Sequence, residues 1–122
     1  MLMLTLPWPP SMNRYWAPLP GGRGMMLTKD ARQYRKLADE AIFKVLGRRV
    51  SEHIFTSPVR LDVELRAPDR RARDLDNHLK AIQDVLTHYG VWVDDNLIDE
   101  LTVRRGKVFP GGQANIIITE LT

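Results

Sequence analysis

The chain has 122 residues, of which 43% are hydrophobic and 27% are charged, with a formal net charge of +3 and no cysteine. This length and composition suit a single domain over residues 1–122, and the lack of cysteine excludes disulfides, Cys-based zinc sites and thiol nucleophiles, as is typical of cytoplasmic proteins. No apolar run approaches the roughly 18 residues that span a membrane, so we expect no membrane partner.

The N-terminal segment predicts a strand followed by a long loop. Residues 1–6 read MLMLTL, which suits a short strand, and the prolines that follow prevent regular strand pairing. Three glycines at positions 21, 22 and 24 close the segment, so we expect a loop over residues 7–24. Loops of this length inside a compact domain are often functional. This one carries Asn13, Arg14, Tyr15 and Trp16.

Residues 28–66 predict a helix and then a strand. Thr28 can cap a helix that ends near Gly47, and its apolar residues recur at helical spacing, namely Ala31, Tyr34, Leu37, Ala38, Ala41, Ile42 and Val45. Val59, Leu61, Val63 and Leu65 then alternate with charged residues, which is the period-two pattern of a strand with one buried face.

The C-terminal half predicts one more helix and three strands. Residues 75–89 return to helical spacing, with Gly90 as the cap at the end. Extended segments are expected at 91–93, around 101–103 and at 116–118, with a turn at 110–112. The resulting order is βαβαβββ, which indicates an α+β fold with two principal helices packed on one mixed β-sheet.

The segment Arg70 to Lys80 reads RRARDLDNHLK and carries the strongest chemical signal. In an extended segment the side chains of Asp74 and Asp76 would point to the same side and could share one hard divalent cation, such as Mg²⁺ or Mn²⁺. Lys80 lies four residues after Asp76 on the predicted helix, where its ammonium could offset phosphate charge. Alternatively, one carboxylate caps the helix and Lys80 forms only a weak surface ion pair.

A second acidic pair, Asp94 and Asp95, follows the short extended segment after Gly90. The helix and the returning chain could bring this pair back toward the start of the helix. In an extended segment the two side chains face opposite ways, so at most one is expected at a metal site. Residue spacing does not decide which of the two it is.

Basic residues cluster in three places, and one cluster, Arg70, Arg71 and Arg73, directly precedes the acidic segment. An acidic spot within a basic chain suggests metal ions set among phosphate contacts. These arginines could clamp phosphates, or they could be solubilising charges. The three histidines lack the spacing of a zinc site, and we expect them to be bystanders.

Three segments resemble the RusA family of phage and prophage Holliday-junction resolvases. They are LPWPPSMNRYW at 6–16, PDRRARDLDNHLKAIQDVLTHYGVWVDD at 68–95, and the glycine turn with IIITE at 116–120. The resemblance implies catalytic carboxylates at Asp74, Asp76 and Asp95 that hold Mg²⁺, with Mn²⁺ as a substitute, and an essential Lys80. It also implies a homodimer that nicks two opposing strands of four-way junction DNA. On such a substrate Asn13, Arg14, Tyr15 and Trp16 could line the branch point, with aromatic rings stacked on exposed bases, or Tyr15 and Trp16 could pack under their loop.

The sequence is also compatible with two other functions. The chain could be a junction-binding accessory protein without catalysis, although the four expected catalytic positions hold suitable residue types. It could also be a related nuclease that acts on flaps, replication forks or RNA.

Overall fold

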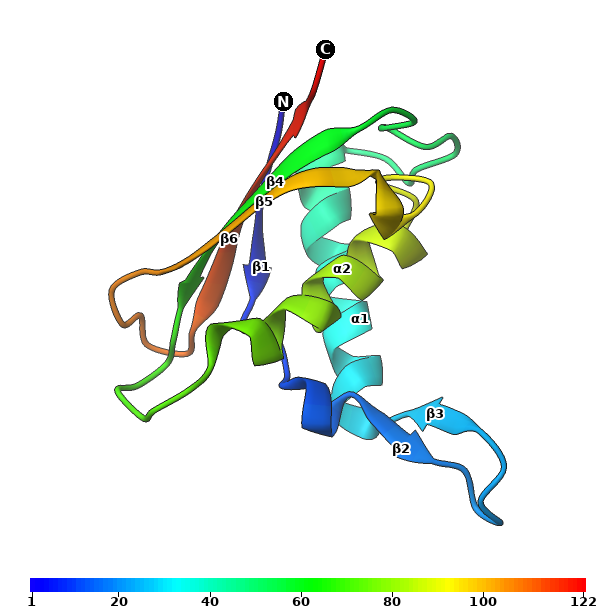
Figure 1. Ribbon diagram of the computed structural model, residues 1–122, viewed down its shortest axis with the longest axis vertical. Helices are drawn as coiled ribbons and strands as arrows, with labels where there is room; N and C mark the ends of the chain where they lie inside the picture. Colours follow the sequence, from blue (N-terminus) through cyan, green and yellow to red (C-terminus); the bar gives the residue numbers. More distant parts are fainter.

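Figure 1 shows the computed structural model of the chain, which describes all residues from Met1 to Thr122. Its class is α+β, as predicted from the sequence. The main elements are β1 (Leu2–Pro7), β2 (Trp16–Pro18), β3 (Met25–Leu27), α1 (Lys29–Leu46), β4 (Val59–Arg66), α2 (Leu79–His88), β5 (Ile98–Arg105) and β6 (Gln113–Glu120). Three short 3-10 turns complete the list, namely η1 (Met12–Arg14), η2 (Leu75–His78) and η3 (Asp95–Leu97).

The main sheet has four strands in the order β1-β6-β4-β5, and it is mixed because β5 runs parallel to β4 while the other pairs are antiparallel. Both helices lie on the same face of this sheet (Figure 1). Along β4 the four residues from Val59 to Leu65 at alternate positions are buried against the helices. The predicted alternation is confirmed, and it follows from the pleat that sends successive side chains to opposite faces.

Helix α1 begins and ends where its capping residues predict. The Thr28 hydroxyl accepts a hydrogen bond of 3.1 Å from the Ala31 N–H, and Gly47 ends the helix with a left-handed φ of 72°. Its buried stripe is narrower than the apolar pattern suggests, because Leu37 and Val45 are 37% and 52% exposed. The sheet and α2 therefore cover only one side of α1.

The second predicted helix, residues 75–89, is divided in the structure. Its first turn is the 3-10 turn η2, in which the Asn77 N–H donates to the Asp74 carbonyl, and the α-helix α2 begins only at Leu79. Gly90, with a φ of 77°, stands just past the end of α2 as predicted. No helix in the structure combines the length and the apolar character needed to cross a membrane.

Two expectations about strands are corrected by the structure. The predicted loop at 7–24 contains η1 and β2, and β2 pairs with β3 in a small hairpin that projects from the body of the molecule (Figure 1). Residues 91–93 form no strand, because Trp92 makes only an isolated bridge to Phe55 and is fully buried. The segment is hydrophobic because Val91 and Trp92 are buried in the core, and not because it forms a strand.

The segments that form the site gather at the end of the sheet opposite the chain termini (Figure 1). They are the segment after β1, the β4–η2 loop and the β5–β6 loop. Gly112 of the β5–β6 loop lies directly against Trp8, where a Cβ atom would come within 2.7 Å of the Trp8 Cβ. This close approach ties the first and last of these segments together.

Candidate active site

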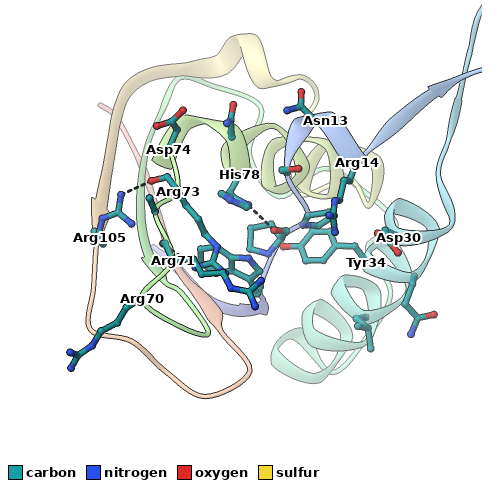
Figure 2. Close-up of a pocket in the computed structure, with 18 residues that line it drawn as sticks. Asn13, Arg14, Asp30, Tyr34, Arg70, Arg71, Arg73, Asp74, His78 and Arg105 are labelled. Atoms are coloured by element: carbon teal, nitrogen blue, oxygen red, sulfur yellow. Dashed lines mark hydrogen bonds between the residues drawn. The ribbon is translucent and has the colours of Figure 1, made fainter.

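A cavity of about 1070 Å³ opens between the segment after β1, helix α1 and the β4–η2 loop (Figure 2). Two carboxylates, Asp30 and Asp74, line it together with a larger set of arginines, namely Arg14, Arg70, Arg71, Arg73 and Arg105. The excess of positive charge in a concave surface favours binding of a polyanion such as a nucleic-acid backbone.

Arg73 is a structural residue of this cavity. Its guanidinium donates to the Asp69 carboxylate at 2.7 Å and lies 5.7 Å from the centre of the Trp8 ring. The Arg73 side chain is only 17% exposed. The hydrogen bonds that Asp69 accepts from the Arg73 guanidinium and from the Arg71 N–H lower the pKa of Asp69 to about 2. Arg73 therefore holds the loop, and whether it also contacts phosphate, as predicted, stays a prediction.

Arg70 and Arg71 are available for such contacts. Both are exposed, and the Arg71 guanidinium, on a side chain that is 83% exposed, lies 3.7 Å from the Asp69 carboxylate. Arg105 was not among the predicted site residues, although it belongs to a basic cluster visible in the sequence. Its guanidinium donates a 2.8 Å hydrogen bond to the Arg73 carbonyl, which joins β5 to the basic loop (Figure 2).

The loop residues expected at a DNA branch point divide into two groups. Asn13, Arg14 and Trp16 are exposed, and Asn13 and Arg14 line the cavity. Tyr15 is only 1% exposed, and its hydroxyl donates to the Asp84 carboxylate. The suggestion that Tyr15 stacks on a base is thus wrong, because the ring is part of the core.

The two carboxylates of the D-x-D motif lie on different local structures. Asp74 is extended, with φ −83° and ψ 127°, but the chain turns immediately after it and Asp76 falls within η2. The extended geometry that would point both side chains to one side therefore ends at Asp74. Both carboxylates are exposed, and Asp76 makes no ion pair with Lys80.

The second acidic pair is brought together by a turn. The Asp94 carboxylate caps η3 by accepting a 3.1 Å hydrogen bond from the Asn96 N–H, and it lies close enough to the Asp95 carboxyl to raise the pKa of Asp95. The expectation that the two side chains face opposite ways assumes an extended segment, and the chain leaves the extended conformation at Asp95. Asp94 itself is exposed.

Opposing effects act on the pKa of Asp95. The contact with Asp94 and partial burial raise the pKa of Asp95, whereas the positive charge of Lys80 acts in the opposite direction. Because η3 packs against α2, the chain does return to that helix, and the charge of Lys80 in its first turn reaches Asp95. The raised pKa means that the negative charge of Asp95 is disfavoured where it stands.

No three Asp, Glu, His or Cys side chains lie close enough together in this structure to form a ready metal-binding group. The donor chemistry of the predicted site nevertheless fits a hard divalent cation, since Asp74, Asp76 and Asp95 all offer carboxylate oxygens. A cation beside Asp95 would also favour the charged form that its surroundings now disfavour.

His78 has a structural role that its spacing in the sequence did not suggest. It is 7% exposed, its Nδ1 lies 2.9 Å from the Pro9 carbonyl, and its ring centre lies 4.7 Å from that of Trp8. The bond requires a proton on Nδ1, so this nitrogen donates. His78 therefore fixes the start of α2 to the segment that follows β1 (Figure 2).

Comparison with known proteins identifies the family of this chain. A family model described as Endodeoxyribonuclease RusA matches residues 7–119. The crossover junction endodeoxyribonuclease of Enterobacteria phage HK97 is 41% identical over 118 residues, which cover 96% of this chain and 92% of the relative. The protein of the same name from Escherichia coli O139:H28 is 36% identical over 119 residues, covering 97% and 93%. The chain belongs to the RusA family of endodeoxyribonucleases.

Proposed function

We propose that this protein is a crossover junction endodeoxyribonuclease that resolves Holliday junctions in DNA recombination and repair. The observation that carries the proposal is the family match over residues 7–119, which includes both the basic cavity and the acidic segments. Curated relatives that share 35% to 41% of their residues with this chain are named for this activity. The reaction is hydrolysis of phosphodiester bonds.

The substrate we propose is four-way junction DNA. The cavity carries several arginines beside Asp74, so phosphates bound there would lie next to the proposed catalytic carboxylates. Arg70 and Arg71 are exposed and Arg14 lines the wall, so these three side chains are the best candidates for backbone contacts. We further propose a cytoplasmic location, where recombining DNA is found.

We propose Asp74, Asp76 and Asp95 as the carboxylates that hold Mg²⁺, with Mn²⁺ as a substitute. When bound, such an ion lowers the pKa of a water molecule and stabilises charge on the leaving oxygen. Lys80 contributes a positive charge beside Asp95, which favours the ionised carboxylate and would offset charge on the phosphate.

A homodimer suits this substrate. A junction with near two-fold symmetry presents two equivalent phosphodiesters, and a two-fold dimer would present two equivalent sites. We therefore propose that two copies of the chain act together to make paired symmetric nicks. Light scattering of the purified protein, with and without junction DNA, measures this stoichiometry directly.

A panel of labelled substrates tests the proposed function. The panel contains a four-way junction, a flap, a replication fork and a linear duplex of the same sequence, each with Mg²⁺. Preferred cleavage of the junction at symmetric positions supports the proposal. Preferred cleavage of flaps or forks would replace it with a different branched-DNA nuclease, and junction binding without cleavage would leave an accessory protein.

A further inference from the structure

Strand β5 forms an open edge of the main sheet. It is the last strand in the order β1-β6-β4-β5, and its backbone pairs only with β4. Six of its eight residues are exposed, and one of these six is the apolar residue Leu101, which is 46% exposed. A long edge strand presents a row of N–H and C=O groups to which another strand can pair.

The hydrogen bonds between β4 and β5 show which residues of β5 present these groups. The Gly106 N–H donates to the Leu65 carbonyl at 2.9 Å, so the backbone of this even-numbered residue is directed toward β4. Backbone groups alternate sides along a strand. Those of residues 101, 103 and 105 are therefore directed toward the open edge, where an antiparallel partner strand would form its hydrogen bonds.

The side chains of β5 are complementary to an antiparallel copy of the same strand. When two copies pair around Thr102, Glu100 of one copy lies opposite Arg104 of the other. Leu101 of one copy then lies opposite Val103 of the other. Centring the pairing on the residue before or after Thr102 leaves Glu100 and Arg104 without an opposite charge across the ladder. Opposite charges and apolar pairs stabilise such a ladder, so the sequence favours the pairing around Thr102.

On the face of the sheet away from the helices, this pairing continues a row of charges. Arg60 of β4 lies beside Glu100 with 3.8 Å between their charged groups, and Glu64 accepts a 2.7 Å hydrogen bond from Arg104. A second copy would place its own Arg104 and Glu64 after Glu100 in this row. The charges would then alternate in sign across four strands, which is favourable at each step.

On the face that carries the helices, the same pairing continues an apolar row. Leu101 lies beside Leu61 of β4, and Val103 lies beside Val63. Leu61 and Val63 are buried, whereas Leu101 remains largely exposed. Val103 of a second copy would lie across the ladder from Leu101 and cover part of this side chain, which removes apolar surface from water.

We propose that β5 is the interface of the homodimer, in which two copies pair antiparallel around Thr102 and join their four-stranded sheets into one. The proposal rests on the proposed function, which supplies the two-fold dimer, and adds its contact surface. Charges on an edge strand commonly prevent association, but here each copy carries both signs at positions that match the other copy. The opposite edge, β1, has no charged side chain and lacks this match.

Because the chain has no native cysteine, disulfide cross-linking tests the register directly. Thr102→Cys would place two cysteines opposite each other in a non-hydrogen-bonded pair, whose Cα atoms lie about 4.5 Å apart, within the range of a disulfide. Glu100→Cys is the matched control on the same face, because its two copies would lie four residues out of register, about 14 Å apart. We expect a covalent dimer from oxidised Thr102→Cys and none from Glu100→Cys. No covalent dimer from Thr102→Cys, or equal yields from both variants, would overturn the proposal.

Charge reversal tests the same pairing without a cysteine. Glu100→Arg and Arg104→Glu would each place like charges opposite each other, and the two-fold symmetry doubles each change. Each variant alone should raise the dissociation constant of the dimer about tenfold or more, measured by sedimentation. An equimolar mixture of the two variants should associate nearly as tightly as wild-type protein, because each copy then meets the opposite charge. Wild-type association of both single variants, or a mixture no tighter than its components, would contradict the interface.

The fold and the proposed function are checked separately. These substitutions lie on an exposed strand, so each variant should melt near the wild-type temperature, which excludes unfolding as the cause of a weaker dimer. Cross-linking and sedimentation are both measured without DNA or metal and do not depend on cleavage. Failure of the proposed function would appear as a dimer that leaves the junction uncut. Failure of the interface would appear as wild-type protein that cleaves the junction while Thr102→Cys does not cross-link.

Discussion

The Arg35 guanidinium donates two hydrogen bonds to the Asp84 carboxylate, at 2.9 Å and 3.0 Å. This pair joins α1 to α2, and the Tyr15 hydroxyl bonds to the same carboxylate. Asp84 thus connects both helices with the segment after η1. Because the two side chains are only 20% and 22% exposed, solvent screens the pair less than an ion pair on the surface.

Replacement of Asp84 by Ala should destabilise the fold by about 1–3 kcal/mol, because the Tyr15 hydroxyl and Arg35 would both lose their partner. Denaturant unfolding measures the loss. Asp62→Ala is the matched control, since the Asp62 pair with Arg60 is more exposed, and its expected effect is below about 1 kcal/mol. Equal losses in the two variants would show that burial of the Asp84 pair has no energetic consequence.

Replacement of Arg71 should affect DNA binding, whereas replacement of Arg73 should affect stability. Arg71→Ala should weaken junction binding and reduce the salt dependence of binding by about one phosphate contact, with little change in melting temperature. Arg73→Ala should lower the melting temperature, because Asp69 and the loop would lose their ion pair. Binding measured over a series of salt concentrations, together with thermal unfolding, separates the two. A reduced salt slope for Arg73→Ala with unchanged stability would reverse the assignment.

Tyr15 and Trp16 should also respond differently. Tyr15→Ala should cost about 3–5 kcal/mol of stability, as expected for removal of a buried aromatic ring from a core. Trp16 is 42% exposed, so Trp16→Ala should change stability much less. If Trp16→Ala also lowers junction affinity, its ring contacts DNA. A large loss of stability from Trp16→Ala would show instead that its packing on Tyr15 matters most.

Stability should depend on the protonation of His78. Burial lowers the pKa of His78 below its usual value of 6.5. The unfolded chain therefore binds a proton more readily at this site, and stability should fall as the pH drops through about 6.5 toward the lower native pKa. His78→Gln, which retains a side-chain donor for the Pro9 carbonyl, should reduce this slope. Unfolding curves between pH 5 and 8 measure it, and an unchanged slope would contradict the assignment.

Local signals in the sequence predicted the elements that depend on local structure. The Thr28 cap, the Gly47 stop and the alternation along β4 were all confirmed, since each depends on residues close together in the chain. The β2–β3 hairpin was missed because strands of three residues carry little periodicity and owe their pairing to tertiary contacts. The strand predicted at residues 91–93 is wrong for a different reason, since burial in a core and strand structure favour similar residues, and Trp92 is buried.

The residue types of the site could be predicted from the sequence, but the contacts between their side chains could not. The sequence indicates the acidic segments and the basic loop, but it does not show that Asp69 occupies Arg73 or that a turn brings Asp94 beside Asp95. These contacts depend on backbone geometry within loops, which has no periodic signature. The cavity itself combines side chains from segments far apart in the chain, including Trp8, Tyr34 and Arg105, and only the fold brings them together.

The measurement that tests the central claim most directly is the cleavage of a labelled synthetic four-way junction by wild-type protein and by Asp76→Asn, each with and without Mg²⁺. We predict paired symmetric nicks by wild-type protein with Mg²⁺, no product without the ion, and loss of cleavage with retained junction binding in Asp76→Asn. Cleavage by Asp76→Asn at the wild-type rate, or tight junction binding by wild-type protein without product under any divalent metal, would contradict the proposed function and its active site.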